Sequence, residues 1–287
     1  MNCSRRRWLN RTLCSTAGVA LAEALAPVLA AAETRTYRIG ACEWSLQKSD
    51  PSCMAVAREL GLDGVQLSMG TLANNMWLQR PDVRRAYKSA ARENRMRISG
   101  LALAELNNIP LKSDPRAAVW LVESIEVAVG LGVKAILVAQ FFKGDLVGDA
   151  EGVRRTIEIL RAAAPCAERA GVILGLENYL SAEANLDILA QVGSPAVQVY
   201  YDVGNSTDKG YDVYAEIRRL KGKICEFHFK DAGYLLGKGR IDFAQVHAAI
   251  AAIEFTGWIQ IEAAAPNGLR KDYPTDLAYL RTFFPKE

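Results

Sequence analysis

The stretch Glu226-Phe227-His228-Phe229-Lys230-Asp231 contains one of only two histidines in the 287-residue chain. Apolar and polar side chains alternate along it. A strand would therefore send Phe227 and Phe229, with Cys225 before them, to one face, and Glu226, His228 and Lys230 to the other. Taken alone, this alternation is typical of a half-exposed strand whose polar face meets water. The alternative is a barrel strand whose polar side faces a site, and the rest of the chain decides between them.

Short β-rich runs alternate with helical patterns from Thr36 onward. Eight strands are predicted, at residues 37–42, 64–68, 96–101, 135–139, 172–177, 197–202, 224–229 and 258–262. Eight helices are predicted between and after them, at residues 52–60, 81–94, 115–129, 152–169, 182–191, 212–220, 243–253 and 275–283. Such alternation implies right-handed parallel βαβ units, and eight of them match a (β/α)8 barrel.

The predicted fold is therefore α/β, a single-domain (β/α)8 TIM barrel over residues 33–287. An open doubly wound sheet is the competing fold. It is disfavoured because no Gly-x-Gly-x-x-Gly motif follows the first strand and the chain has no P-loop.

Residues 1–32 have the order of an export signal. The basic stretch Ser4-Arg5-Arg6-Arg7-Trp8-Leu9 precedes a moderately apolar run that ends in three alanines. Glu23 interrupts this run and argues against a permanent membrane span. The stretch resembles the twin-arginine export signal, with Trp8 in place of the usual Phe; an amphipathic first helix is the alternative. We expect contact with the twin-arginine export machinery, cleavage after Ala32, a periplasmic or secreted location, and no membrane association of the mature chain.

Charge and cysteine content exclude other classes. Four of the 35 basic and one of the 32 acidic residues lie in the signal, so the mature chain is neutral and has no electrostatic footprint for nucleic acid. Its four cysteines form no Cys-x-x-Cys pair, which argues against a zinc ribbon or a disulfide scaffold. Free thiols are expected, with a Cys42–Cys53 pair as the alternative.

Four residues that can bind a metal stand at or near the ends of the last four predicted strands: Glu177, Asp202, His228 and Glu262. Their spacings of 25, 26 and 34 residues are each one βα unit. The strand period turns all four inward, while their preceding neighbours Leu176, Tyr201, Phe227 and Ile261 point to the helices. Each residue alone is better explained as a helix cap, a solvated carboxylate or a structural histidine. Their coincidence at the face where barrel active sites lie favours a common site.

Three carboxylates and one imidazole would repel one another without a cation between them. Mostly oxygen ligands with a single imidazole suit one divalent ion, with Mn²⁺ favoured and Mg²⁺, Co²⁺ or Zn²⁺ as alternatives. The other histidine, His247, lies on the predicted seventh helix, away from any strand end, and is expected to be structural.

The mature chain resembles the xylose-isomerase-like (β/α)8 barrels, which include sugar phosphate isomerases and epimerases. The order and spacing of the four residues carry this resemblance, as does Gly237-Lys238-Gly239-Arg240-Ile241-Asp242-Phe243 after the seventh predicted strand. It implies that Glu177 and Glu262 each hold the metal and exchange a proton with the substrate. The ion would polarise a carbonyl and hydroxyl pair, and the two carboxylates would move the proton through an enediolate.

Substrate-binding residues are less clearly marked. The ketose 3-epimerases of this family carry a histidine and an arginine where this chain has Asn205 and Tyr234. Lys230 is a candidate to bind a substrate oxygen, although an ion pair with Asp231 is an equal alternative. Further candidates that follow strands or lie within them are Gln66, Asn108, Asn205, Glu43, Glu105, Asn107, Gln140 and Lys143.

These residues favour a metal-dependent isomerase or epimerase of a sugar or sugar-like polyol outside the cytoplasm. A lyase or dehydratase on 3-keto sugars or inososes is the related alternative. A catalytically inactive periplasmic sugar-binding barrel is disfavoured, because binding alone needs no paired acid and base. An endonuclease IV-like nuclease is ranked low, because that family needs a histidine-rich site. The expected partner is a small carbohydrate, and self-association into a homo-oligomer is left open.

Overall fold

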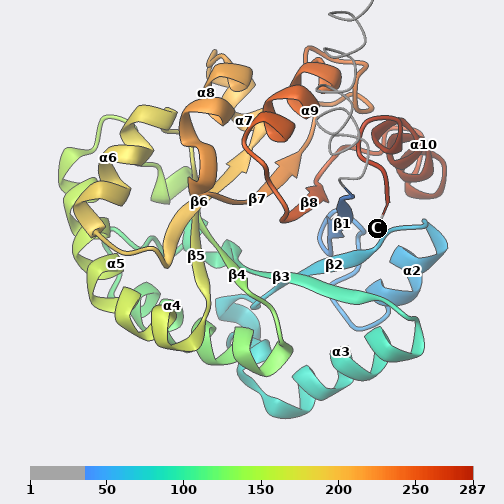
Figure 1. Ribbon diagram of the computed structural model, residues 1–287. Coiled ribbons are helices and arrows are strands. Elements are labelled where there is room, and N and C mark those ends of the chain that lie inside the picture. The colour runs from blue at the N-terminus through green and yellow to red at the C-terminus, as the bar shows by residue number, and fades with distance from the viewer. Residues whose placement is uncertain (1–35, 287) are drawn as a thin grey trace, which may run out of the picture. The chain divides into compact units, whose positions relative to one another are not determined.

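Eight parallel strands pair in chain order and close into a barrel in the computed structural model, which describes residues 36–286 (Figure 1). Pairing of the first strand with the last closes the barrel. This confirms the predicted (β/α)8 fold. The strands are β1 (Arg38–Cys42), β2 (Gly64–Ser68), β3 (Arg97–Leu103), β4 (Ala135–Gln140), β5 (Ile173–Asn178), β6 (Val197–Asp202), β7 (Ile224–Phe229) and β8 (Trp258–Ile261).

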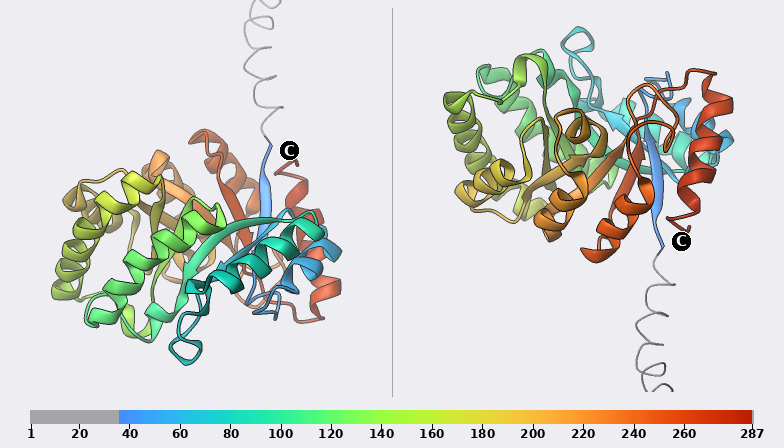
Figure 2. Two further views of the ribbon diagram at one scale, coloured as in Figure 1. Left: turned by 90° about the horizontal axis from the view of Figure 1, so that it is seen from below. Right: turned by 90° about the horizontal axis from the view of Figure 1, so that it is seen from above.

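Helices surround the barrel as an outer layer, which the two side views show (Figure 2). Several begin at a side chain that accepts a hydrogen bond from the first turn and end at a glycine with positive φ, as with Asp149 and Gly171 of α5. The helices are α2 (Cys53–Glu59), α3 (Pro81–Glu93), α4 (Pro115–Leu131), α5 (Ala150–Ala170), α6 (Ala182–Val192), α7 (Val203–Asp208), α8 (Val213–Leu220), α9 (Phe243–Ala252) and α10 (Leu269–Arg281).

Two of these helices differ from the prediction. Helix α7 was not predicted: its six residues follow β6 directly, and the carboxylate of Asp202 accepts a hydrogen bond from its backbone. Helix α10 begins at Leu269 rather than at residue 275, because Pro274 lies inside the helix instead of before it. The first error hides a feature of the site, since Asp202 is both a helix cap and a predicted ligand.

The alternation predicted for β7 is correct at its C-terminal end and wrong at its start. Phe227 and Phe229 face outward, where Phe229 packs against Phe243 of α9 with ring centroids 5.2 Å apart. Cys225 was expected on this face. The pairing of β6 with β7 instead shifts by one residue there, and the extra residue of this bulge, Cys225, packs with Tyr200 inside the barrel.

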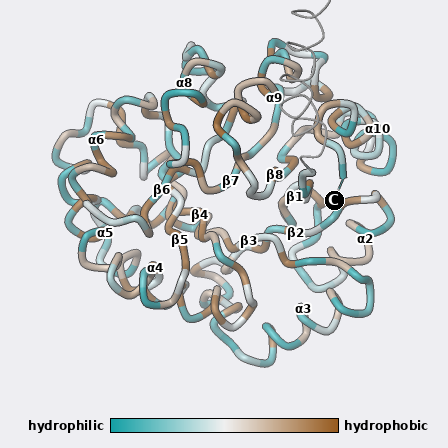
Figure 3. Tube along the Cα trace, in the orientation of Figure 1, coloured by the Kyte–Doolittle hydropathy of each residue, from teal (hydrophilic) through white to brown (hydrophobic). Residues whose placement is uncertain are grey.

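Apolar side chains form two separate clusters, and the strands at the centre of Figure 3 are correspondingly rich in hydrophobic residues. The larger cluster fills the space between strands and helices. The smaller lies within the barrel and consists of Ala102, Leu137, Ala139, Phe141 and Tyr200. The rest of the barrel interior is largely polar.

Glycines make room for these inner side chains. A Cβ on Gly40 would lie 2.3 Å from Oε1 of Gln260 and 2.9 Å from the carbonyl oxygen of Gly64. A Cβ on Gly175 would lie 2.6 Å from Sγ of Cys225. No larger residue fits at these two positions without a shift of the barrel wall.

The described part of the chain also bears on two other predictions. Cys42, Cys53, Cys166 and Cys225 are free, as expected. Over residues 36–286, no helix is both long and apolar enough to span a membrane. The predicted export signal, residues 1–32, lies outside the described residues.

Candidate metal and active site

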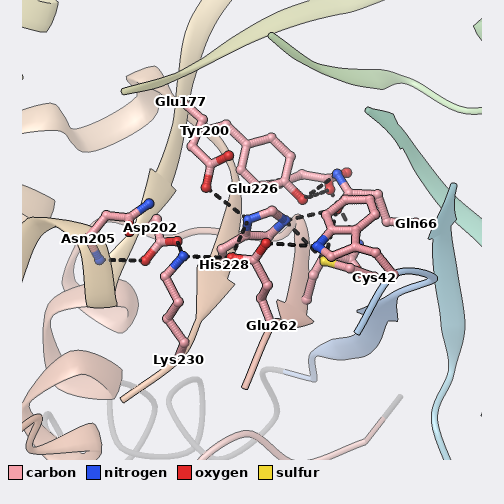
Figure 4. A network of polar contacts seen from close by, with 12 residues as sticks. Cys42, Gln66, Glu177, Tyr200, Asp202, Asn205, Glu226, His228, Lys230 and Glu262 are labelled. Carbon is pink, nitrogen blue, oxygen red and sulfur yellow. Dashed lines mark hydrogen bonds and ion pairs between the residues drawn. The ribbon is translucent and has the colours of Figure 1, made fainter. Parts of the chain in front are cut away.

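The four predicted ligands meet at the C-terminal ends of their strands (Figure 4). Asp202 ends β6 and pairs in register with His228 of β7. Glu177 lies one residue before the end of β5, and Glu262 directly follows β8. One ligand atom from each residue lies within 4.8 Å of the other three. The structure therefore brings together the set that the spacing of βα units predicted.

His228 is fully buried, and its two ring nitrogens face different partners. Nδ1 lies 2.9 Å from Oε1 of Glu177 and 3.6 Å from Oε2 of Glu262. Nε2 lies 2.8 Å from Oε1 of Gln66. An amide oxygen only accepts hydrogen bonds, so Nε2 carries a hydrogen and donates it to Gln66. Nδ1 is thus the nitrogen directed at the carboxylates, and a proton or a cation is needed between them.

Gln66 lies within the barrel, beneath the ring of His228, instead of at the mouth expected for a substrate contact. Its Nε2 donates to the hydroxyl of Tyr200 at 3.0 Å, and that hydroxyl donates to Oε2 of Glu226 at 2.9 Å. Gln260 reaches the same carboxylate oxygen at 3.4 Å. This layer of buried polar residues supports His228 from below and holds its orientation.

Lys230 forms two ion pairs inside the site. Its Nζ lies 2.7 Å from Oδ2 of Asp202 and 2.7 Å from Oε2 of Glu262. The alternative pairing with Asp231 is wrong, because the backbone after β7 occupies that carboxylate. Asp231 accepts hydrogen bonds from the backbone N–H groups of Gly237, Gly239, Arg240 and Ile241.

Burial and neighbouring charges give the two glutamates different proton affinities. Burial raises the pKa of Glu177 to about 7, against the opposing effect of His228. Burial acts in the same direction on Glu262, but His228 and Lys230 outweigh it and lower the pKa to about 2. For His228, burial lowers the pKa, while Cys42, Glu177 and Glu262 raise it more strongly. There is therefore a pH range in which Glu262 is ionised while Glu177 still holds a proton.

The donor set fits a divalent metal ion. Three carboxylates and one imidazole nitrogen converge, and the ammonium of Lys230 balances only part of their charge. Oxygen-rich sets with a single imidazole suit Mn²⁺, Mg²⁺ or Co²⁺. Glu177, Asp202, Glu262 and Nδ1 of His228 are the groups that would hold the ion.

Sequence reasoning missed three residues that contact this set. One is Cys42, whose Sγ lies 3.4 Å from Nε2 of His228. Trp44, in the turn after β1, donates from Nε1 to Oε1 of Glu262 at 2.9 Å. Tyr200 stacks edge-on against His228 with centroids 4.6 Å apart. Strand alternation pointed to Tyr200, because it lies two residues before Asp202 and so on the same face. Nothing local marks Trp44, which depends on how its turn folds over the barrel.

Other predicted substrate residues lie at different depths. The backbone N–H of Asn205 donates to Oδ1 of Asp202 at 2.8 Å, which places this residue at the start of α7 beside the site (Figure 4). Asn108 is exposed, and its amide donates to Glu105 within the same turn. Glu43 is buried against Ser68 and Tyr87. Asn107 accepts from the backbone of Phe141.

His247 packs in an aromatic group and away from the strand ends. Its ring lies edge-on to Phe284 with centroids 5.0 Å apart and also contacts Tyr37 and Phe283. Burial lowers its pKa. This position agrees with the structural role predicted for it.

Fold and site together define a parallel (β/α)8 barrel with a carboxylate and histidine cluster at the C-terminal ends of its strands. The chain belongs to the xylose isomerase-like TIM barrel family, whose model matches residues 54–283.

Two relatives of this chain are epimerases. A 2-epi-5-epi-valiolone 7-phosphate 2-epimerase from Actinoplanes sp. is 30% identical over 178 residues, which cover 62% of this chain and 66% of the relative. An L-ribulose-5-phosphate 3-epimerase from Salmonella paratyphi C is 26% identical over 229 residues, covering 73% and 80%. The chain thus spans just under two thirds of the first relative.

Solved structures share the fold. D-psicose 3-epimerase from Clostridium cellulolyticum superposes with a TM-score of 0.73 at 17% identity, over 86% of this chain and 99% of that one. The 3-keto-D-glucoside 4-epimerase from E. coli superposes with a TM-score of 0.72 at 15% identity over the same shares. At such identity these likenesses support the barrel and no finer property.

Proposed function

We propose that this protein is a divalent-metal-dependent epimerase or isomerase of a sugar or sugar-like polyol. The observation that carries the proposal is the convergence of Glu177, Asp202, His228 and Glu262, with one atom of each inside a 4.8 Å group. The names of the relatives support the same class, since both describe epimerases of sugar-like phosphates.

The two glutamates are the proposed proton carriers. Epimerisation next to a carbonyl needs one group that removes a proton and one that returns a proton from the other side. Glu262 and Glu177 come from strands β8 and β5, and their different proton affinities suit a base and an acid. The bound ion would supply Lewis-acid polarisation of the substrate oxygens. The role proposed for Lys230 is to orient a substrate oxygen, which its position 2.7 Å from oxygens of Asp202 and Glu262 supports.

Mn²⁺ is the favoured ion because three of the four proposed ligands are carboxylates, which bind through oxygen. Metal analysis of the purified protein should give about one ion per chain. Added Mn²⁺ should also raise the melting temperature of protein treated with a chelator. A fully folded protein that neither retains nor responds to any divalent ion would refute the metal-dependent mechanism.

Proton exchange tests the chemistry directly. In D₂O, NMR should show deuterium entering the carbon next to the carbonyl of at least one aldose, ketose, cyclitol ketone or 3-keto glycoside. Glu177→Gln and Glu262→Gln should each lower this exchange by a factor of about 10² or more. The matched control is Glu43→Gln, which alters a buried carboxylate outside the ligand group. Exchange that survives both substitutions would assign the proton transfer to other residues.

The same spectra separate the alternatives. Inversion without loss of a group identifies an epimerase, and movement of the carbonyl identifies an isomerase. Loss of a hydroxyl or glycosidic group identifies the dehydratase or lyase alternative. Binding without exchange across the panel would favour the inactive sugar-binding barrel.

We also propose that the substrate is met outside the cytoplasm, on the basis of the signal-like residues 1–32 alone. Replacing Arg5, Arg6 and Arg7 by lysine should prevent export through the twin-arginine machinery. Cell fractionation with an antibody to the barrel measures this. Equal periplasmic amounts of the native and lysine proteins would contradict twin-arginine export.

A further inference from the structure

A cavity opens on the opposite side of the barrel from the four ligands. It lies among the first residues of the strands, at the N-terminal face, and has a volume of about 760 Å³. Arg38 of β1, Ile173 of β5 and Trp258 of β8 are among its lining residues. Cavities of this size accommodate metabolites and cofactors. The catalytic chemistry proposed above uses none of these residues.

Two β-bulges shape the inner end of this cavity. In the pairing of β2 with β3, Val65 is opposite Ile98 and Gln66 is opposite Gly100, so Ser99 is the extra residue. Cys225 is the extra residue of the corresponding bulge in β7. Both line the cavity, together with Glu226. Bulges redirect side chains, and here each turns one small side chain, Ser99 or Cys225, toward the interior near the start of its strand.

Ser99 has the feature expected of a residue that awaits a ligand. Its side chain is only 3% exposed, and its hydroxyl has no hydrogen-bond partner among residues 36–286. A buried hydroxyl without a partner has lost its contact with water and gained no hydrogen bond in return, which is destabilising. The buried hydroxyl of Tyr200, by contrast, is paired with Glu226. Thr156 of α5 is also buried without a partner in the described part of the chain, but it does not line the cavity. Ser99 instead borders a large cavity with room for a bound molecule.

The entrance of the cavity is basic. Lys134, in the turn before β4, and Lys221, in the turn before β7, both line it and are exposed. Arg97 is a further lining cation, and the guanidinium of Arg38 lies 5.1 Å from the centre of the Trp258 ring. The acidic lining residues are Glu226, which is buried, and Glu254. Cations thus outnumber carboxylates at the entrance, which favours an anionic ligand.

We propose that this N-terminal cavity is a second binding site, for a small organic anion. The carboxylate or phosphate of the ligand lies at Lys134 and Lys221, and its polar, hydroxyl-bearing end reaches Ser99. Solvated surface lysines alone would not explain the volume of the cavity or the unpaired hydroxyl of Ser99 that borders it. The N-terminal face of such barrels usually contributes to stability, and their active sites lie at the C-terminal face. The proposed anion site is therefore separate from the proposed active site.

Two tryptophans allow the sites to be observed separately. Trp258 lines the N-terminal cavity, whereas Trp44 contacts Glu262 at the candidate active site. The full chain, which has five tryptophans, is labelled with 5-fluorotryptophan. The ¹⁹F signals of Trp258 and Trp44 are identified by their loss in Trp258→Phe and Trp44→Phe. Inorganic phosphate, citrate and 6-phosphogluconate are then titrated at low ionic strength. We expect at least one of these anions to shift the Trp258 signal saturably.

Substitutions then test the assigned contacts. Lys134→Glu combined with Lys221→Glu should weaken this binding at least about tenfold, and Ser99→Ala about fivefold. The matched control is Lys48→Glu combined with Lys238→Glu, two exposed lysines that follow β1 and β7 and so lie on the C-terminal side. It should leave the affinity unchanged.

Three results would overturn the proposal. The first is a Trp258 signal that none of the three anions moves. The second is a shift of the Trp44 signal alone, which assigns the anion to the candidate active site. The third is equal affinity in the native protein and in the variant with Lys134 and Lys221 reversed, with both proteins equally stable before the anion is added.

Discussion

Oε1 of Gln66 lies 2.8 Å from Nε2 of His228. Nε2 is the ring nitrogen that faces away from the carboxylates. This contact selects the tautomer of the histidine, because only Nε2–H can donate to an amide oxygen. The remaining nitrogen, Nδ1, is then free to bind a cation beside Glu177 and Glu262. Groups that orient a metal-binding histidine in this way commonly matter nearly as much as the ligands themselves.

Gln66→Leu is therefore expected to weaken metal binding by about 10- to 100-fold without removing a ligand. Isothermal titration with Mn²⁺ measures the affinity, and ¹⁵N NMR of the His228 ring measures the tautomer. The matched control is Gln260→Leu, because Gln260 is equally buried and its side-chain amide donates to Glu226 rather than to the His228 ring. If both variants bind metal alike, Gln66 has no special role in positioning the histidine.

Lys230 competes with a metal for the same two carboxylates. Its ammonium lies 2.7 Å from oxygens of both Asp202 and Glu262. Lys230→Met should raise the affinity for Mn²⁺ at least about tenfold, since a positive charge close to the ion is removed. The same variant should raise KM if the ammonium also binds substrate. Lys238→Met, an exposed lysine of the following loop, is the control, and an unchanged affinity in Lys230→Met would show that the ion pairs do not oppose metal binding.

Trp44 stabilises the ionised form of Glu262 through the hydrogen bond from its indole nitrogen. Trp44→Phe should raise the pKa of Glu262, and so move the acidic limb of the pH–rate profile to higher pH. The exchange rate near that limb should fall about tenfold, consistent with loss of a hydrogen bond to a charged group. Trp77→Phe controls for general effects of losing an indole. An acidic limb that stays in place would show that the indole does not tune this carboxylate.

The barrel and its four candidate ligands were predictable for one physical reason. Each parallel strand ends at the same face, so residues one βα unit apart in sequence become neighbours in space. Alternation then placed Asp202 and His228 inside and Tyr201 and Phe227 outside. Both inferences rest on local patterns in the sequence, namely the repeat of the βα unit and the two-residue alternation of a strand.

What escaped prediction depends on contacts distant in sequence. The bulge at Cys225 arises from the pairing of β7 with β6, and no neighbour in the sequence marks it. Lys230 stands beside Asp231, yet it pairs with Glu262 at the end of the neighbouring strand β8, because the following loop satisfies the Asp231 carboxylate. Gln66 was predicted near the pocket, but whether it faces substrate or supports His228 depends on its depth in β2.

Glu43 offers a test of electrostatics outside the metal group. Its buried carboxyl accepts hydrogen bonds from the backbone of Ser68 and the hydroxyl of Tyr87. Burial outweighs these contacts and raises the pKa of Glu43 from 4.5 to about 7. Between these two values the folded chain binds the proton more tightly than the unfolded chain does. The free energy of unfolding should therefore fall as the pH rises through this window.

Glu43→Gln removes this titration. The amide oxygen keeps the hydrogen bond from the backbone N–H of Ser68, and the amide NH2 faces the hydroxyl of Tyr87, which can accept instead of donate. The native protein should lose about 3 kcal/mol more unfolding free energy than the variant between pH 4.5 and pH 7, the equivalent of the pKa shift of Glu43. Denaturant unfolding at several pH values measures the difference. Glu93→Gln, at an exposed position of α3, controls for loss of one carboxylate. Parallel pH dependence in the native protein and Glu43→Gln would mean that Glu43 titrates alike in the folded and unfolded chains.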